Sequence, residues 1–243
     1  TRDRLQAAYA VARQALLDER QANSYWEGEL SASALSTATA ISALVLYQEP
    51  VIATHTEAPK STRQESEQLL TLVHQGIQWL QDHQNQDGGW GDTDQSYSNI
   101  ATTLLVVAAF HLAGVATAQA GLLARAEAYI ETQDRFAGLR KRYGKDKTFV
   151  VPILTNLALA GLVPWKDVNS LPFELACLPQ SFYRFVRLPV VSYAIPALVA
   201  IGQARYLHQP PWNPFSRWLR RAALSPSLRV LEKMQPTSGG YLE

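Results

Sequence analysis

Apolar residues recur at intervals of three and four positions along almost the whole chain of 243 residues. The first such stretch carries Leu5, Ala8, Tyr9, Ala12, Ala15 and Leu16, which fall on one face of a helix. Strand-like alternation of apolar and polar residues is scarce. This pattern predicts an all-α fold, in which each helix buries one face against its neighbours.

The same periodicity predicts where the helices lie. They are expected over residues 33–47, 64–83, 98–112 and 121–132, and near 148–160, 192–206, 214–223 and 226–234. Ser98 is expected to cap the fourth helix of the chain and Gly114 to follow its end. Four prolines then punctuate a connecting region, at Pro164, Pro172, Pro179 and Pro189. Segment 49–63 is polar, contains proline and has no period, so we expect a surface excursion there.

One turn between two of these helices contains a tryptophan. Residues 81–92 read QDHQNQDGGWGD, in which Gln84, Gly88 and Trp90 follow the helical pair Trp79-Leu80. The spacing returns near the end of the chain, where Gln235, Gly239 and Tyr241 follow Val230-Leu231. Two eroded copies are Arg20, Ser24 and Trp26 after Leu16-Leu17, and Gln133 after Tyr129-Ile130. The repeat therefore marks the end of one helix and the turn into the next.

The residue types of this turn suit a helix end better than an active site. Gly88 can take a positive φ without a Cβ clash. The Gln84 amide can donate to free carbonyls at a helix end, and the Trp90 ring can close over that end. A P-loop is disfavoured, because its Lys and Ser/Thr are missing and no strand precedes the turn. We interpret Trp26, Gln84, Gly88, Trp90, Gln235, Gly239 and Tyr241 as structural repeat residues.

Composition and charge disfavour several classes of function. The net charge is +1, so no global field favours a nucleic acid. Residues 1–100 carry 6 Lys/Arg and 13 Asp/Glu, whereas residues 101–243 carry 16 and 8. An anionic partner such as a membrane surface, or simply solvated helix faces, would account for the basic half.

The metal-ligating residue types give no cluster in the sequence. Cys177 is the single cysteine, which excludes an internal disulfide, and its apolar neighbours indicate a buried inert thiol and not a nucleophile. The five histidines lack the spacing of a metal site. No metal and no cofactor are expected. Since no apolar run of about 18 residues exists, a membrane would be met only at its surface.

The turn and three further segments resemble the class II triterpene cyclases, and more closely their squalene–hopene branch. Gln75-Gly76, Trp79-Leu80, Gln84, Gly88 and Trp90 are similar to the QW repeat of that family. YWEGEL at 25–30, LALAGLVPW at 157–165 and the stretch at 173–203 resemble family segments in the same order. The resemblance implies an α/α barrel (toroid) of helical hairpins, with 1–243 as a single domain of the amino-terminal, non-acid-bearing type. It also implies an incomplete fold, continued elsewhere by a catalytic domain.

The resemblance implies a carbocation chemistry in which this segment is inactive alone. The family protonates a linear polyprene with a D-x-D-D aspartate, and the cation then runs through a dry aromatic pocket. No D-x-D-D occurs here; Asp92-Thr93-Asp94-Gln95 is interpreted as a helix-approach or capping segment, so no catalytic residue is assigned. Tyr193, Pro152 and Asn156 fall at pocket positions of the family and are the expected substrate-binding residues. Only Tyr193 is aromatic, and it could instead be an ordinary packed residue.

The resemblance also implies partners. A squalene-like polyprene is the expected substrate, and a monotopic or peripheral position on the cytoplasmic side of a membrane is expected. The aromatics and arginines of 204–226 suit a headgroup layer, RNA or a solvated helix, and the family favours the first. Two chains could pair as a homodimer. The alternative from another class is a non-catalytic α/α toroid that serves as a binding or assembly module.

Overall fold

The computed structural model describes residues 2–20, 31–54, 60–144, 149–185 and 194–235. It divides into two compact units, Thr1–Ala32 and Ser33–Glu243. The assignment of 1–243 to a single domain stays a prediction. In the first unit α1 covers Arg2–Asp18, none of whose residues is buried.

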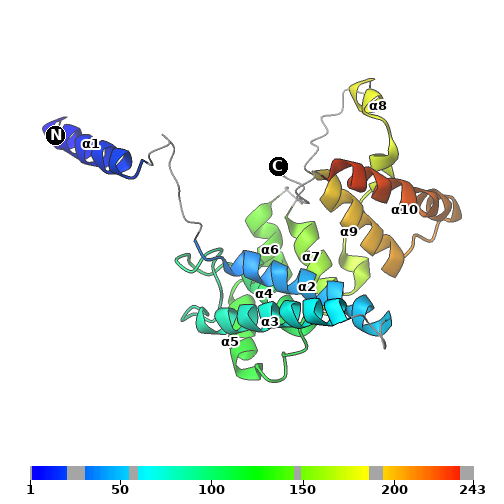
Figure 1. Ribbon diagram of the computed structural model, residues 1–243, viewed down its shortest axis with the longest axis horizontal. Helices are drawn as coiled ribbons and strands as arrows, with labels where there is room; N and C mark the ends of the chain where they lie inside the picture. The colour runs from blue at the N-terminus through cyan, green and yellow to red at the C-terminus, as the bar shows by residue number, and fades with distance from the viewer. Residues whose placement is uncertain (1, 21–30, 55–59, 145–148, 186–193, 236–243) are drawn as a thin grey trace. The chain divides into compact units, whose positions relative to one another are not determined.

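Every regular element of the second unit, within the described ranges, is helical (Figure 1). The α-helices are α2 (Ala34–Thr54), α3 (Lys60–Asp82), α4 (Ile100–Leu112), α5 (Ala120–Thr132), α6 (Arg135–Tyr143), α7 (Val150–Leu159), α8 (Gln180–Phe185), α9 (Ile195–His208) and α10 (Pro214–Met234). Two 3₁₀ turns, η1 (Trp165–Asp167) and η2 (Phe173–Cys177), connect α7 to α8. The all-α prediction is confirmed.

Helix α4 is the centre of the larger core. Every residue from Ile100 to Phe110 is buried, which fits a helix that is apolar on all sides. Helices α2, α5, α6 and α7 all contact it. Helices α2 and α3 run antiparallel beside each other, as Figure 1 shows, and α3 therefore reaches the core mainly through α2.

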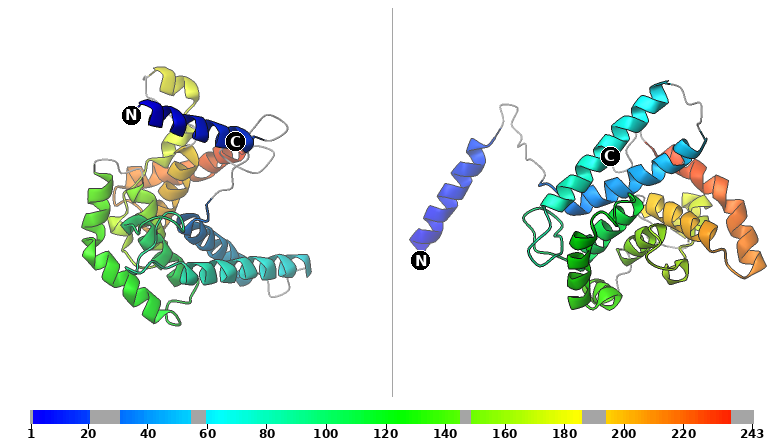
Figure 2. Two further views of the ribbon diagram at one scale, coloured as in Figure 1. Left: turned by 90° about the vertical axis from the view of Figure 1, so that its left-hand side faces the viewer. Right: turned by 90° about the horizontal axis from the view of Figure 1, so that it is seen from below.

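A second, smaller core joins η2, α9 and α10, and the last two helices are drawn in orange and red in Figure 2. Phe173, Tyr206 and Ala223 are buried in it. The Arg220 guanidinium donates to the Leu171 carbonyl at 3.3 Å and lies 3.5 Å from a Glu174 carboxylate oxygen. This arginine thus fixes α10 to η2.

Five sequence expectations need correction. The N-cap of α4 is Asn99, whose Oδ1 accepts from the Thr102 N–H at 3.0 Å, and not Ser98. Segment 49–63 is helical at both ends, because α2 continues to residue 54 and α3 begins at residue 60. Helix α10 passes through Pro226 without a break, and α6 and α8 were not expected at all. Cys177 is exposed and not buried.

Candidate functional site

The turn after α3 brings its backbone unusually close to α5. Gly88 has a φ of +86°, and a Cβ there would lie 2.5 Å from the Arg125 carbonyl oxygen. Glycine is therefore required at this position both by the left-handed backbone and by the space. Gly91 is equally confined, since a Cβ would lie 2.3 Å from the Ser96 carbonyl oxygen.

Gln84 connects the turn to α5. Its Nε2 donates to the Gly88 carbonyl at 2.8 Å and to the Leu122 carbonyl at 3.0 Å. The Arg125 guanidinium donates to its Oε1. The Gln84 amide thus donates to the loop after α3 and to the beginning of α5. The sequence suggested instead that it would donate to the last carbonyls of α3.

Trp90 closes over the end of α3. Its side chain is 0% exposed, and its indole N–H donates to the Leu80 carbonyl at 2.9 Å, a carbonyl of the last helical turn. Its backbone N–H donates to Thr103 Oγ1 at 3.0 Å, and its carbonyl accepts from the Asn99 N–H at 2.9 Å. One residue therefore joins the end of α3 to the beginning of α4.

Asp92 supports the N-terminus of α4. Its Oδ1 accepts from Thr102 Oγ1 at 2.6 Å and from Asn99 Nδ2 at 2.8 Å. A carboxylate at a helix N-terminus is also favoured by the helix dipole. The interpretation of Asp92–Gln95 as a helix-approach segment agrees with these contacts.

Pro152 and Asn156 lie four residues apart and so share one face of α7. The buried residues of α7 are Val150, Val151, Ile153, Leu154, Thr155, Leu157 and Ala158. Pro152 is exposed and Asn156 is half-buried, so their face is the side of α7 that the core leaves uncovered. Asn156 Oδ1 accepts from Ser42 Oγ of α2 at 3.3 Å.

The remaining predicted residues fall at the edge of the described structure or beyond it. Tyr193, Trp26, Gly239 and Tyr241 lie outside the described residues. Gln235 is the C-cap of α10, where its N–H donates to the Leu231 carbonyl at 3.0 Å. The pocket residues and the repeat copies therefore stay predictions.

A cavity of about 200 Å³ lies between α2, α3 and the segment after α4. Its lining residues are Val45, Gln48, Leu70, Val73, His74, Ile77, Ala113 and Val115. Neither Pro152 nor Asn156 lines it. The uncovered face of α7 is therefore distinct from this cavity.

Hydroxyl and thiol groups of the second unit have shifted acidities. Burial, and then the Asp87 carboxylate, raise the pKa of Tyr129, while Arg142 opposes the shift. Burial, and then the Glu174 carboxylate, raise the pKa of the Cys177 thiol. Although Cys177 is exposed, it is therefore less ionised at neutral pH than an ordinary cysteine.

The end of the described chain carries an exposed aromatic cluster, which we call the α10 aromatic surface. It consists of Trp212, Phe215 and Trp218, which are 96%, 68% and 65% exposed. Arg217 and Arg221 are exposed among them, whereas Arg220 is held by η2. The sequence could not separate Arg220 from the other two arginines, because its partner Ser170 lies 50 residues earlier.

In the described ranges no three His, Cys, Asp or Glu side chains gather as metal ligands. No helix in those ranges has the length and apolar character needed to cross a bilayer.

The all-helical fold of the described residues is consistent with the N-terminal domain of a terpenoid cyclase. More closely, the chain belongs to the squalene–hopene cyclase N-terminal domain family, whose model matches residues 9–201. No solved structure gives a significant match. The family resemblance drawn from the sequence is thereby confirmed.

Two curated relatives are a cyclase and a synthase by name. The chain is 29% identical over 203 residues to a squalene hopane cyclase of Aspergillus fumigatus. It is 26% identical over 192 residues to the enfumafungin synthase of Hormonema carpetanum. Each match covers 79% of this chain, but only 23% and 12% of the respective relative. The matches support a cyclase-related function.

Proposed function

We propose that this chain is the amino-terminal part of a squalene–hopene-type cyclase. The complete protein would fold a linear polyprene and cyclise it by a protonation-initiated carbocation cascade. The family match over residues 9–201 carries this proposal. The acid that starts the cascade is assigned to no residue of this chain, whose part is to shape the hydrocarbon pocket.

The uncovered face of α7 is the proposed wall of that pocket. Pro152 offers a rigid apolar surface, and Asn156 is oriented by its hydrogen bond with Ser42. A folded hydrocarbon is steered by the shape of such a wall, and a π face such as that proposed for Tyr193 stabilises a nearby cation. This chain would thus affect which product forms more than whether protonation occurs.

Product analysis tests the role of α7. The complete protein in its natural reading frame is incubated with squalene, and the products are separated by gas chromatography with mass detection. Asn156→Ala is expected to change the product ratio, because it changes the shape of the uncovered face. Tyr193→Ala is expected to do the same with little effect on folding.

Gln78→Ala is the matched control, because it removes an exposed amide from α3 whose hydrogen bonds go to Asp82 of the same helix. Its product ratio should stay close to that of the wild type. Unchanged products in both Asn156→Ala and Tyr193→Ala would refute the pocket role. No product from squalene, oxidosqualene or shorter polyprenes would favour the non-catalytic toroid instead.

We further propose that the α10 aromatic surface rests on the cytoplasmic side of a membrane as a monotopic contact. Exposed tryptophans beside arginines suit the headgroup layer, where rings meet the apolar boundary and cations meet phosphates. The polyprene would enter from the bilayer. Pairing of two chains remains a prediction without a structural basis in the described residues.

Vesicle flotation tests this contact. The variant W212S/F215S/W218S is expected to lose most of its binding to phosphatidylcholine vesicles. Tyr97→Ser is the control, because Tyr97 is an exposed aromatic on the turn before α4. Equal flotation of all three proteins would refute the contact.

A further inference from the structure

Helix α6 presents a basic surface away from the core. Leu139 is fully buried, and Phe136 and Tyr143 pack against the core from the same stripe, at i−3 and i+4. The three consecutive residues Arg140, Lys141 and Arg142 therefore lie on the other side of the helix, where all three are exposed. No acidic residue occurs from Arg135 to Tyr143.

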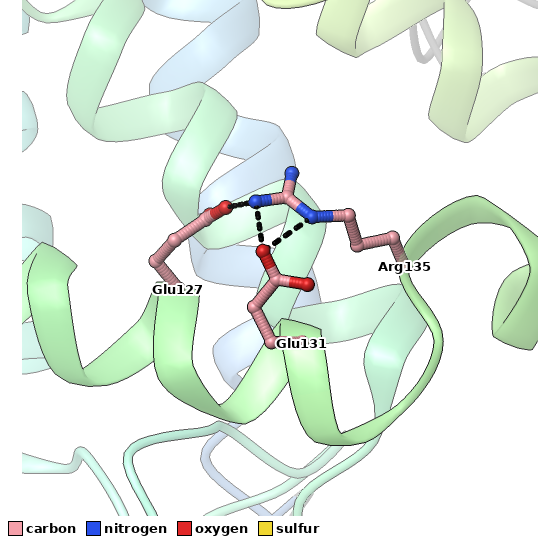
Figure 3. Close-up of polar contacts among 3 residues, drawn as sticks. All are labelled: Glu127, Glu131 and Arg135. Atoms are coloured by element: carbon pink, nitrogen blue, oxygen red, sulfur yellow. Dashed lines mark hydrogen bonds and ion pairs between the residues drawn. The ribbon is translucent and has the colours of Figure 1, made fainter.

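The beginning of α6 is held by a clamp of charged residues, shown in Figure 3. Arg135 Nε donates to Glu131 Oε1 at 2.7 Å, and its Nη2 also binds Glu127. Asp134 and Arg135 have φ values of 58° and 50°, so the chain leaves α5 through two left-handed residues. Because Glu127 and Glu131 offset its charge, Arg135 is not counted in the basic surface.

Unlike Arg135, the side chains of Arg140, Lys141 and Arg142 form no ion pair within the described residues. The Arg142 guanidinium lies 5.9 Å from the centre of the Tyr143 ring, which stacks on Phe149 at 5.4 Å. The Phe149 ring is 56% exposed. Cations and an exposed ring therefore form one surface, named here the α6 basic surface.

We propose that the α6 basic surface binds the anionic headgroups of a phospholipid membrane. The inference rests on the membrane attachment proposed above and adds a lipid preference to it. Three uncompensated cations attract an anionic leaflet, and the Phe149 ring can enter the apolar boundary beneath the phosphates. Each basic residue near such a surface strengthens binding about fivefold, so three give on the order of 100-fold.

An anionic membrane fits this surface better than a nucleic acid or an acidic protein segment. A nucleic acid is read by cations together with several stacking rings in a groove, whereas a single ring is exposed here. Exposed cations beside one exposed ring suit a surface that is charged at its headgroups and apolar below.

Cosedimentation with vesicles tests the proposal on the 243-residue chain. The probes are phosphatidylcholine vesicles with and without phosphatidylserine, at low and high salt. The wild type should bind the anionic vesicles more tightly, and salt should remove the difference. The variant R140Q/K141Q/R142Q should lose on the order of 100-fold of the binding that phosphatidylserine adds.

Two control variants distinguish binding by the α6 basic surface from an effect of the net charge of the chain. The variant R2Q/R4Q/R13Q removes the same three charges from exposed positions of α1 and should keep the lipid preference. The variant R140K/R142K keeps the charge and should bind like the wild type, because headgroup attraction requires charge and not the arginine fork. Equal losses in the α6 and α1 glutamine variants would overturn the proposal.

The two membrane proposals fail in different ways. Binding to phosphatidylcholine that phosphatidylserine does not strengthen would overturn the α6 inference and leave the α10 contact standing. A preference for phosphatidylserine that persists in W212S/F215S/W218S would support the α6 inference alone. Binding of single-stranded RNA that is lost in R140Q/K141Q/R142Q, without any change toward vesicles, would overturn it in favour of a nucleic acid.

Discussion

Removal of the Trp90 side chain should be among the most costly substitutions in the chain. The side chain is 0% exposed, and the Leu80 carbonyl that it binds belongs to a residue that is itself fully buried. Truncation of a buried tryptophan to alanine costs about 3–5 kcal/mol. Of this, about 1–3 kcal/mol is the cost of leaving the Leu80 carbonyl without a partner or water.

Trp90→Phe separates the two contributions. A phenyl ring fills most of the space but cannot donate, so this variant should lose about 1–3 kcal/mol. For a domain of this size each kcal/mol lowers Tm by roughly 2–4 °C. Trp90→Ala should therefore lower Tm by roughly 6–20 °C and Trp90→Phe by roughly 2–12 °C, which thermal unfolding followed by far-UV circular dichroism can resolve.

Trp212→Ala is the matched control, because the same residue type is 96% exposed there. It should change the free energy of unfolding by less than about 0.5 kcal/mol. If Trp90→Phe is as stable as the wild type, the indole hydrogen bond does not stabilise the turn. If Trp90→Ala destabilises the chain no more than Trp212→Ala does, the role of Trp90 in joining α3 to α4 is refuted.

Three further outcomes are expected. Gly88→Ala should lower the free energy of unfolding by more than the roughly 1 kcal/mol typical of point substitutions, because alanine strains the left-handed backbone and its Cβ collides with α5. An unchanged midpoint of urea unfolding would contradict this. Iodoacetamide should react slowly with Cys177 at neutral pH, since its pKa is raised, and Glu174→Gln should speed the reaction by removing the second cause. The hydrogen bond with Arg135 holds the pKa of Glu131 below its ordinary value. The ionised Glu131 therefore stabilises the fold at any pH above the ordinary glutamate pKa, and this stabilisation is lost as the pH falls through the lowered pKa. Arg135→Gln should move the NMR titration of Glu131 up to the ordinary glutamate range, and an unmoved titration would refute the clamp.

The helices that the sequence predicted are those whose apolar period is long. Helices α4 and α5 begin and end within two residues of the expected positions. Helix α6 was missed because its inward stripe has only Phe136, Leu139 and Tyr143, and because Gly138 lowers its helix propensity. The left-handed corner before it is built from Asp134 and Arg135, which carry no glycine signal.

Pro226 shows why a breaker can fail to break a helix. The sequence predicted two helices near 214–223 and 226–234, with Pro226 at the beginning of the second. In the fold Gln203 of α9 donates to the Leu224 carbonyl at 2.9 Å and to Ser227 Oγ at 2.8 Å. Ser227 Oγ in turn donates to the Ala223 carbonyl at 2.7 Å. Side chains thus bind the Ala223 and Leu224 carbonyls beside the proline, and the contact of Gln203 with α10 is a tertiary one that the local sequence does not reveal.

The turn after α3 was predicted by spacing, but its partners were not. Gln84 meets residues 38 and 41 positions later in α5, and Trp90 meets Thr103 13 positions later. A single sequence gives the residue types of such contacts but not their pairing, because pairing depends on how helices pack. The candidate pocket was limited in the same way: Pro152 and Asn156 share a face by helical spacing alone, while the link to Ser42 is a tertiary contact.

The turn and the proposed pocket wall are coupled through α4. Trp90 and Asp92 fix the first residues of α4, and α7 packs against the same helix further along. A rigid, fully buried helix transmits a displacement at its N-terminus to whatever packs on it. A weakened turn should therefore alter the products of the complete enzyme even though Trp90 touches no substrate in the proposed scheme. Such an effect would accompany a loss of stability in Trp90→Phe, whereas a change caused by Asn156→Ala should appear at unchanged stability, and that difference separates a positioning residue from a residue of the wall.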